Sequence, residues 1–352
     1  MTTPTKKSIL ITGAGGLVGP LLARRLLRDP NYSQHTIYLT DLSPPIIPSA
    51  SPSNGITPDR LKTVIPVQGD ITSPSFVSSL VAQTLENGAA KLEAVFIFHG
   101  IMSAGSEANF EQSLKVNVDS VRLLLDEIRR TAAPGTRVVY SSSQAVYGQP
   151  LPEVVTDDVM PTPQSTYGAH KLMMETYIND LHRKGFIEGF IVRFPTISVR
   201  PGNPTAAASS FLSGIIREPL DGQECVVPIE DRSFRSYLSS PRTIAENLVR
   251  VLEMDAGRLP EHRRVINFPG ISVSVQELLD ALEKVGGKEA VGLVKEKRDE
   301  GLEKVLRSWP TDFDTSVAVG RLGLVVDEGV DRLVEEYVVD AMLTLKREAA
   351  PV

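Results

Sequence analysis

The sequence predicts an α/β protein in which a doubly wound parallel sheet is followed by a smaller C-terminal α/β lobe. Short apolar runs alternate with stretches of helical periodicity through the first two hundred residues, and this alternation is typical of parallel strands joined by helices. The alternation becomes irregular after Pro195. With 352 residues the chain is also longer than a usual single core, so two lobes are expected.

The predicted elements follow from the positions of these runs. Strands are expected near Ile9, Ile37, Val64, Val95, Val138 and Ile191, and helices near Leu21, Val77, Val121 and Leu172. After residue 195, a loop-like stretch leads to a helix at Phe211–Arg217 and a short strand at Cys225–Ile229. Two later helices, Arg242–Met254 and Val275–Val285, flank a strand at Val265–Phe268. We therefore assign residues 1–195, with about 230–268 returning to them, to the larger lobe, and residues 196–229 and 269–352 to the smaller one.

Composition argues against several classes of partner. The formal net charge of -6 disfavours binding to nucleic acid or to an anionic membrane surface, and no apolar run approaches the roughly 20 residues of a membrane span. The N-terminus runs into the first strand without the apolar segment of a signal peptide, and a single cysteine, Cys225, cannot form an internal disulfide. We therefore expect a cytoplasmic protein in which Cys225 is a buried structural thiol. No cysteine or histidine motif suggests a metal site, so no metal is expected.

A glycine-rich heptad, GAGGLVG at Gly13–Gly19, links the first strand to the first helix. Side chains at Gly13 or Gly16 would block a tight turn and the approach of phosphates to backbone N–H groups, and Gly19 allows the helix to pack on the strand. The positive end of the helix dipole then faces the anion. The heptad thus predicts a dinucleotide-binding start of the Rossmann type, with Gly13, Gly16, Leu17 and Val18 at the cofactor. An ordinary β-to-α turn is the alternative.

The second strand ends in Asp41, about twenty residues past the last glycine, where an acid can accept hydrogen bonds from both ribose hydroxyls and would repel a 2′-phosphate. No Arg or Lys lies between Asp41 and Asp59. The predicted cofactor is therefore NAD rather than NADP; a helix or turn cap in TDLSPP is the alternative role of Asp41. The following stretch, Ser43–Pro58, is rich in Pro and Ser and is expected to be a loop, either mobile beside the adenosine site or an inert surface insertion.

Three residues further along the chain combine into a proton-transfer site. The fifth strand ends at Ser143, and Tyr167 and Lys171 lie one turn apart at the start of an amphipathic helix. Taking the proton of a secondary alcohol at neutral pH needs a base with a pKa of about 7, whereas a free phenol titrates at about 10. An ammonium about 4 Å away supplies about 4 kcal/mol at an effective dielectric of about 20, so Lys171 is assigned to lower the pKa of Tyr167 and to bind the nicotinamide ribose. Ser143 would hydrogen-bond the reacting oxygen, and Ser141 and Ser142 are expected to be backbone partners at the strand end. Without Ser143, Tyr167 and Lys171 alone would indicate only a surface pair.

Together these motifs resemble the extended short-chain dehydrogenase/reductase superfamily, which includes NAD-dependent epimerases and dehydratases, over nearly the whole chain. The resemblance is carried by the glycines, Asp41, the Asp70 of QGDIT, and the triad of Ser143, Tyr167 and Lys171. The stretches SSSQAVYG and PTPQSTYGAHK are similar to nucleotide-sugar epimerases. The longer segment from Arg193 to Glu224, RFPTISVRPGNPTAAASSFLSGIIREPLDGQE, is closer to D-erythronate dehydrogenases.

The resemblance implies further contacts with the cofactor. Asp70 and Ile71 would lie at the adenine, His99 to Ile101 along the end of the fourth strand, and Pro195 to Ile197 near the nicotinamide, with Asn117 supporting the site. The cofactor set is then Gly13, Gly16, Leu17, Val18, Asp41, Asp70, Ile71, His99, Gly100, Asn117, Tyr167, Lys171, Pro195 and Ile197. A structural histidine is the alternative for His99. The resemblance also implies a homodimer formed through the helices near Val121 and Leu172.

One departure from the superfamily bears on the substrate. Sugar-nucleotide enzymes carry a motif like RDYIHVxD after the second-lobe strand, whereas this chain has RSYLSSPR, which keeps Arg235 and Tyr237 but lacks the His and Asp. D-erythronate dehydrogenases resemble it in the RxxxxSPR spacing. Arg235 could then hold a substrate carboxylate by a bidentate fork; its alternative is a surface residue or a relic of a phosphate site. Arg200 is a second candidate for this contact, and its alternative is a structural salt bridge. The predicted substrate contacts are Ser103, Ser143, Tyr167, Arg200, Asn203 and Arg235.

These features predict an NAD-dependent oxidation of the C2 hydroxyl of a short polyhydroxy acid, such as D-erythronate, by hydride transfer with Tyr167 as the general base. Residues 1–195 would bind NAD and the smaller lobe the substrate. Two other hypotheses stay open. An NAD-retaining nucleotide-sugar epimerase or dehydratase would use the same triad and release no net NADH. A cofactor-sensing regulatory protein with a vestigial site would bind NAD without turnover.

Overall fold

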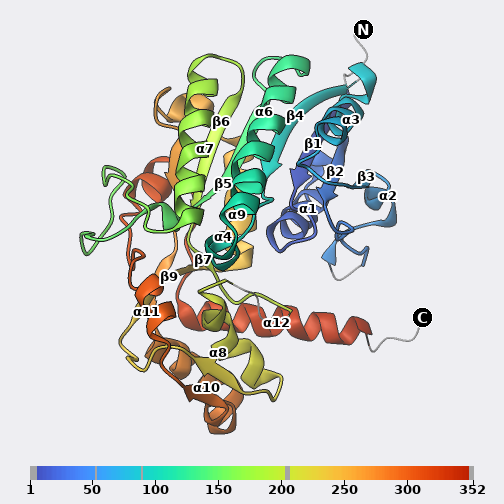
Figure 1. The fold of residues 1–352 in the computed structure, drawn as a ribbon. Coiled ribbons are helices and arrows are strands. Elements are labelled where there is room, and N and C mark those ends of the chain that lie inside the picture. The colour runs from blue at the N-terminus through green and yellow to red at the C-terminus, as the bar shows by residue number, and fades with distance from the viewer. Residues whose placement is uncertain (1–5, 52–53, 89, 203–206, 349–352) are drawn as a thin grey trace. The chain divides into compact units, whose positions relative to one another are not determined.

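The computed structural model describes residues 6–51, 54–88, 90–202 and 207–348, and the chain divides into two compact units (Figure 1). Unit 1 consists of Met1–Val146, Ser165–Phe194 and Ala245–Ile266. Unit 2 consists of Tyr147–Gln164, Pro195–Ile244 and Asn267–Val352. The chain therefore passes between the units several times. The roles assigned above to the two lobes stay predictions.

A seven-stranded sheet forms the centre of unit 1. Its strands are β1 (Lys6–Thr12), β2 (His35–Asp41), β3 (Val64–Gln68), β4 (Ala90–Ile97), β5 (Arg137–Ser143), β6 (Glu188–Phe194) and β10 (Val265–Asn267), in the order β10-β6-β5-β4-β1-β2-β3. Strands β1 to β6 pair in parallel. The strand order reverses between β1 and β4, which is the point where open α/β sheets bind their ligands. The predicted doubly wound fold is confirmed.

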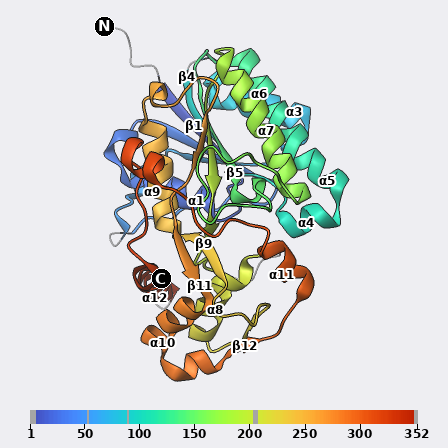
Figure 2. The ribbon, with the colours of Figure 1, turned by 90° about the vertical axis from the view of Figure 1, so that its left-hand side faces the viewer.

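Helices cover both faces of this sheet. They are α1 (Val18–Arg28), α2 (Pro58–Leu61), α3 (Pro74–Thr84), α4 (Ser103–Ala108), α5 (Phe110–Leu114), α6 (Ser120–Thr131), α7 (Thr166–Arg183) and α9 (Pro241–Glu253), with a π-helical segment, η4 (Lys115–Asp119), leading into α6. Figures 1 and 2 show α6 and α7 side by side over the sheet. Buried side chains of α3, α6 and α7, including Val77, Leu124 and Ile178, pack there against Val95 and Val138. The helices predicted near Leu21, Val77, Val121 and Leu172 are confirmed.

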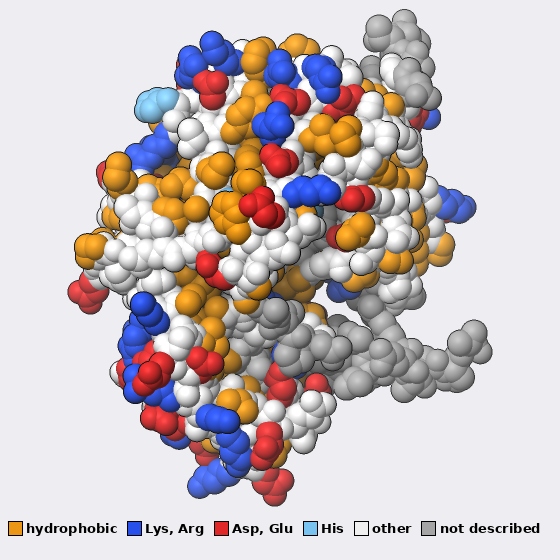
Figure 3. All heavy atoms as spheres, in the orientation of Figure 1, with side chains coloured by type: hydrophobic (Ala, Val, Ile, Leu, Met, Phe, Trp, Pro, Cys, Tyr) orange, Lys and Arg blue, Asp and Glu red, His pale blue; other side chains and the backbone are white. Residues whose placement is uncertain are grey.

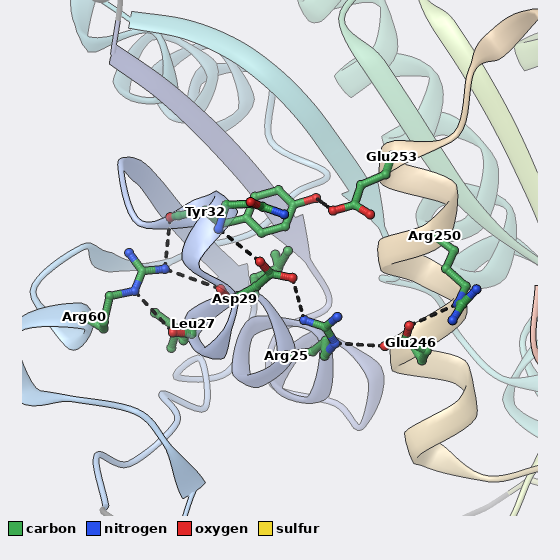
Figure 4. Close-up of polar contacts among 10 residues, drawn as sticks. Arg25, Leu27, Asp29, Tyr32, Arg60, Glu246, Arg250 and Glu253 are labelled. Atoms are coloured by element: carbon green, nitrogen blue, oxygen red, sulfur yellow. Dashed lines mark hydrogen bonds and ion pairs between the residues drawn. The ribbon is translucent and has the colours of Figure 1, made fainter.

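Polar contacts join the returning segment of unit 1, residues 245–266, to the first helix (Figure 4). Arg25 on α1 pairs with Asp29 at 2.9 Å and with Glu246 on α9 at 3.0 Å. The Tyr32 hydroxyl, in the short 3₁₀ turn Pro30–Tyr32, donates to Glu253 at 3.1 Å. Arg264 is fully buried, and its guanidinium donates to the carbonyls of Gly189, Ala256 and Leu259 at 2.8–2.9 Å. The segment is therefore held to α1 near its start, through Glu246, and to β6 near its end, through Arg264.

The described residues of unit 2 form two small sheets and four α-helices. Strand β9 (Arg235–Ser239) lies between β11 (Ile271–Ser274) and β7 (Thr196–Ile197), and β8 (Cys225–Val227) pairs with β12 (Val294–Glu296). The helices are α8 (Ser210–Leu220), α10 (Val275–Gly292), α11 (Glu300–Leu306) and α12 (Val330–Glu348), and a second π-helical segment spans Ser316–Arg321. Apolar side chains of α8 and α10, such as Ile215 and Leu278, form one core. The predicted helix at Phe211–Arg217 and strand at Cys225 are confirmed, whereas the stretch expected to be a loop contains the short strand β7.

The surface of unit 2 carries interspersed charges of both signs. Figure 3 shows positive and negative side chains intermixed there, and some of them form ion pairs, such as Arg298 with Glu303 and Arg307 with Asp231.

Cys225 is buried, and burial raises the pKa of its thiol to about 12, as expected for a structural thiol. In the part of the chain that the structure describes, no helix is long and apolar enough to cross a membrane.

Candidate active site

The glycine-rich turn follows β1 and begins α1 at the carboxyl edge of the sheet. Gly13 has a φ of +70°, and a Cβ atom there would lie 2.6 Å from the backbone carbon of Phe98. A Cβ at Gly19 would lie 2.8 Å from the Cα of Ala14. The Leu17 side chain caps no backbone N–H of α1, and the first turn holds no acidic residue. Glycine is thus required sterically, and the helix start presents N–H donors and a positive dipole end, which fits a pyrophosphate.

Asp41 closes this turn from the end of β2. Its Oδ2 accepts a hydrogen bond from Gly15 N at 2.9 Å, and its Oδ1 accepts one from Ser43 N at 3.1 Å. Asp41 therefore does cap the turn after β2. A carboxylate has about four acceptor positions, so this capping leaves acceptor capacity for ribose hydroxyls. Ile46 N donates to Ala14 O at 2.9 Å, which brings the first part of the Ser43–Pro58 loop back to the glycine turn.

The end of β3 lies beside the end of β2, because Gly69 N donates to Asp41 O at 2.9 Å. Asp70 follows, and its Oδ1 accepts from the backbone N and the hydroxyl of Thr72 at 2.9 and 2.8 Å. These hydrogen bonds hold the pKa of the Asp70 carboxyl below its ordinary value. Ile71 packs against the core beneath the sheet edge. Both residues thus lie next to Asp41, at the edge where the adenosine was predicted.

The loop after β4 is fixed from two sides. His99 contacts the Thr12 hydroxyl through Nδ1 at 2.7 Å and the Ser120 hydroxyl through Nε2 at 2.9 Å. Two causes lower the pKa of His99 to about 3: burial is the larger, and the charge of the nearby Lys171 ammonium is the smaller. The His99 ring is therefore neutral. Both ring nitrogens of His99 contact hydroxyl groups of the protein, which fits the alternative that His99 is a structural histidine. A Cβ at Gly100 would lie 3.8 Å from Lys171 Nζ, so this loop runs close to the predicted triad.

Asn117 supports the same loop from the π-helical segment η4. Its Oδ1 accepts from Ile101 N at 2.7 Å, and its Nδ2 donates to Ile101 O and to Ser113 Oγ at 3.0 Å each. Ser103, a predicted substrate contact, is buried at the first position of α4. The supporting position implied for Asn117 thus has a physical basis, because a single buried amide satisfies both backbone groups of Ile101.

The triad lies where β5 ends and α7 begins. Ser143 is the last residue of β5, and its hydroxyl accepts from Ala145 N at 3.1 Å. Ser165 caps α7 by accepting from Gly168 N at 3.1 Å, which places the half-buried Tyr167 in the first turn of the helix. Lys171 Nζ lies 5.5 Å from the centroid of the Tyr167 ring and donates to Ser141 O at 2.7 Å. Burial lowers the pKa of Lys171 to about 7, and the carboxylate of Glu175 opposes this shift.

Sequence reasoning missed a buried ion pair below the triad. Glu175 on α7 and Arg193 on β6 form two contacts, Nη2 to Oε2 at 2.6 Å and Nε to Oε1 at 2.9 Å. The Ser142 hydroxyl donates to Glu175 Oε1, so Ser142 was wrongly expected to be a backbone partner. Its neighbour Ser141 does donate to a backbone carbonyl, that of Ile97, at 2.9 Å. One carboxylate therefore links β5, β6 and α7 at the edge that carries the triad.

The remaining predicted contacts belong to unit 2. Ile197 O accepts from Arg200 Nε at 2.8 Å, next to Pro195 at the start of this segment. Arg235 is exposed, donates to the hydroxyl and carbonyl of Ser272 at 2.9 and 2.7 Å, and lies 3.2 Å from Glu277. Asn203 lies outside the described residues.

The SSP part of RSYLSSPR has a structural function. Asp327 accepts hydrogen bonds from the Ser239 hydroxyl at 3.0 Å, Ser240 N at 2.9 Å and the Thr243 hydroxyl at 2.7 Å. These contacts hold the start of α9, where sugar-nucleotide enzymes would carry the His and Asp of their motif. Tyr237 is buried and accepts from Gly270 N at 2.7 Å.

Within the described residues, no group of three or more His, Cys, Asp or Glu side chains could hold a metal ion.

The chain is similar to known proteins over nearly its whole length. The model of the NAD dependent epimerase/dehydratase family matches residues 9–265. The D-erythronate dehydrogenase of Haemophilus influenzae is 34% identical over 94% of this chain and 98% of its own length. That of Cupriavidus necator is 37% identical over 96% of this chain and 99% of its own length. The UDP-glucose 4-epimerase of Bacillus subtilis is 25% identical over 80% of this chain and 83% of its own.

Solved structures give the same picture of the fold. The nucleoside-diphosphate-sugar epimerase from Agrobacterium tumefaciens has a TM-score of 0.83 and 32% identity, with 95% of this chain and 94% of that chain covered. The L-threonine 3-dehydrogenase from Trypanosoma brucei has a TM-score of 0.78 and 22% identity, with 95% and 97% covered. At that lower identity, the second likeness concerns the fold alone.

Proposed function

This chain belongs to the NAD-dependent epimerase/dehydratase family, and we propose that it is an NAD-dependent dehydrogenase that oxidises the C2 hydroxyl of a short polyhydroxy acid such as D-erythronate. The observation that carries the proposal is the similarity to two D-erythronate dehydrogenases, at 34% and 37% identity over 94% and 96% of the chain. The positions of Ser143, Tyr167 and Lys171 at the carboxyl edge of the sheet support it.

Tyr167 is proposed to take the proton from the C2 hydroxyl. The hydroxyl of Ser143 donates a hydrogen bond to the reacting oxygen and stabilises the negative charge that develops there. Lys171, anchored on Ser141 O, lies close enough to the Tyr167 ring for its ammonium to favour the phenolate. The chemistry that NAD supplies when bound is acceptance of a hydride by the nicotinamide ring.

The residues proposed to hold NAD follow the sheet edge in order. The glycine turn and the start of α1 would receive the pyrophosphate, and Asp41 the ribose hydroxyls. Asp70 and Ile71 would lie at the adenine, and the His99–Gly100 loop beside the nicotinamide ribose. Pro195 and Ile197 are proposed to border the nicotinamide. Because Asp41 would repel a 2′-phosphate, NAD is proposed over NADP.

The carboxylate of the acid is proposed to bind an arginine of unit 2. Arg235 is the first candidate, because its guanidinium is exposed and offers a planar fork. It already donates to Ser272 through Nε and Nη2 and lies 3.2 Å from Glu277, so a bidentate substrate carboxylate would have to displace these partners. Arg200, whose Nε is held by Ile197 O, is the second candidate. Ser103 and Asn203 complete the proposed substrate contacts.

The experiment that tests the function compares three classes of substrate. Purified protein is mixed with NAD and D-erythronate, with erythritol as an uncharged polyol of the same length, or with UDP-glucose, and NADH formation and product identity are followed. Formation of NADH with D-erythronate, little with erythritol, and its loss in Tyr167→Phe would support the proposal. Turnover of UDP-glucose in preference to every aldonate would contradict it.

A nucleotide-sugar epimerase is the second candidate function. It is favoured by the likeness to the Agrobacterium tumefaciens epimerase, at 32% identity and a TM-score of 0.83. Such an enzyme would retain NAD through purification and convert its sugar without accumulating NADH. The SSP segment that binds Asp327 argues against it, because the chain has no His or Asp in that part of the motif.

Three further expectations accompany the proposed function. The protein is proposed to act as a homodimer through α6 and α7, and size-exclusion chromatography with light scattering would measure its mass in solution. Residues 1–195 are proposed to bind NAD, and the segments 196–229 and 269–352 the substrate, with Arg235, which lies in unit 2 between these segments, as a further substrate contact. Location in the cytoplasm stays a prediction.

A further inference from the structure

We propose that Glu175 is a positioning residue for the reaction: held by Arg193 and Ser142, its carboxylate keeps the buried ammonium of Lys171 charged and fixes it beside Tyr167. The inference rests on the proposed function, because it concerns the same site. It assigns to a buried ion pair a role in proton transfer rather than in folding alone.

Two features of the structure link Glu175 to Lys171: their spacing on α7, and their contacts with neighbouring residues of β5. The two residues lie four positions apart on α7, so they occupy neighbouring positions on one helix face. Both are almost fully buried, with 2% and 3% of their surfaces exposed. Through the sheet, Glu175 binds the hydroxyl of Ser142, and the preceding residue, Ser141, supplies the carbonyl that accepts from Lys171 Nζ at 2.7 Å.

Arg193 fixes the orientation of this carboxylate. Ser142 and Arg193 are direct partners in the parallel β5–β6 register. Both donate to Glu175 Oε1, and Arg193 also donates to Oε2 at 2.6 Å. A bidentate guanidinium contact restricts the rotation of the carboxylate. Movement of Glu175 would therefore disturb the strand ends that carry Ser141 and Ser143.

Besides Glu175, the groups around Lys171 that favour its charge are uncharged: the Ser141 carbonyl and the rings of Tyr140 and Tyr167. Within the described residues, its ammonium forms no ion pair, and it lies 4.7 Å from the ring of Tyr140 on β5. His99 beside it is neutral, and burial raises the pKa of Tyr140 well above its ordinary value. Near the start of α7, Glu107 on α4 accepts from Thr166 N at 2.6 Å. The charged residues of α5 and η4, which contact α7, are exposed to solvent, namely Glu111, Lys115 and Asp119.

Glu175 is thus the buried anion available to offset the desolvation of Lys171. Burial lowers the pKa of Lys171 to about 7, and the Glu175 carboxylate opposes that shift. If Glu175 loses its charge, the buried guanidinium of Arg193 loses its carboxylate partner and stays as a positive charge next to α7. Desolvation and repulsion then act in the same direction, and both release the proton of Lys171. An uncharged Lys171 no longer favours the phenolate of Tyr167.

The test uses Glu175→Gln, with Glu188→Gln as its matched control. Glu188 pairs with Arg137 at 2.6 Å between the same two strands, at their opposite ends. A third variant, Glu175→Leu/Arg193→Met, removes both buried charges; such apolar replacements of a buried pair often preserve or increase stability. It keeps the test available if Glu175→Gln does not fold.

The first measurement does not depend on activity. The protein is labelled with ¹³Cε-lysine, the Lys171 signal is assigned by its absence in Lys171→Met, and its chemical shift is followed against pH. In Glu175→Gln the titration of Lys171 should move to lower pH by about one unit or more, because both causes act together. In Glu188→Gln it should stay where it is in the unmodified protein. In the double variant it should move in the same direction by a smaller amount, because Arg193 no longer repels it.

The second measurement is the pH profile of kcat/KM with NAD and D-erythronate. A shift of about one unit leaves about a tenth of Lys171 protonated at pH 7 instead of about half, so kcat/KM there should fall about five-fold in Glu175→Gln. Unchanged titration of Lys171 in both Glu175 variants, with a loss of thermal stability only, would overturn the inference. A shifted titration in a protein that turns over no aldonate would support this inference while overturning the proposed substrate.

Discussion

Replacement of Lys171 by Met should stabilise the fold at neutral pH while removing the proposed activity. The lysine is 3% exposed, and its unbranched stem is close in shape to methionine. Burial lowers the pKa of Lys171 from 10.5 to about 7. Between these two pH values the unfolded chain binds more protons than the folded protein, so the free energy of unfolding of the unmodified protein rises with pH across this window.

The size of the effect follows from the same two values. Each unit of pKa difference corresponds to about 1.4 kcal/mol, so the full window from pH 7 to 10.5 is worth about 5 kcal/mol. Methionine loses the hydrogen bond from Lys171 Nζ to Ser141 O, which costs about 1 kcal/mol. Lys171→Met should therefore be more stable than the unmodified protein by about 4 kcal/mol at pH 7 and below. The advantage should shrink by about 1.4 kcal/mol for each unit of pH above 7.

Urea unfolding at a series of pH values from 6 to 9 measures this difference directly. Taking the difference between the two proteins cancels the titration of all groups that they share. Lys91→Met, which removes an exposed lysine of β4, is the control for the loss of a lysine that is not buried. A stability difference that does not change with pH, or a Lys171→Met protein that is less stable at pH 7, would show that the buried ammonium carries no such cost.

Three other predictions concern the proposed chemistry. Tyr167→Phe should lower kcat by about 10²–10⁴ with little change in NAD affinity, as measured by steady-state kinetics and calorimetry, because the general base is removed; near-normal turnover would place the proton acceptor elsewhere. Asp41→Ala should narrow the preference for NAD over NADP in kcat/KM, and equal use of both cofactors by the unmodified protein would contradict the role of Asp41. Arg235→Leu should raise KM for D-erythronate, at a cost of about 1.5–3 kcal/mol in binding. Glu277→Gln, which removes the acidic partner of Arg235 but keeps its hydrogen bonds to Ser272, should leave that KM unchanged or lower it.

The order of the elements in unit 1 could be predicted because each signal is local. Apolar runs such as those around Ile9 and Val138 are long enough to indicate buried strands, and the helices between them show a clear period. The glycine turn is local as well, since Gly13 must adopt a positive φ where the chain passes Phe98. Unit 2 was harder to predict because its strands are two to five residues long, as in β7, and their pairing depends on partners distant in sequence.

The positions of some proposed site residues could be predicted because their spacing follows the ends of strands and the starts of helices. Ser143 ends β5 and Tyr167 begins α7, as the strand-end and helix-start signals indicated. Asn117 entered only through the resemblance, because nothing near it in sequence shows that its amide will satisfy the backbone of Ile101, sixteen residues earlier. For Asp41, the capping of the turn and the proposed ribose contact were treated as alternatives, although one carboxylate can accept enough hydrogen bonds for both.

The buried pair of Glu175 and Arg193 was missed for a different reason. Four residues after Lys171, Glu175 looks like half of an ordinary exposed helix pair. Arg193, however, interrupts the apolar run GFIVRF, which forms a strand inside a parallel sheet. Central strands of such sheets are covered on both faces, and arginine is almost never fully buried without a partner. A charged residue in a central strand therefore predicts a buried counter-charge on a neighbouring helix, and the apolar face of α7 that carries Lys171 also carries that acid.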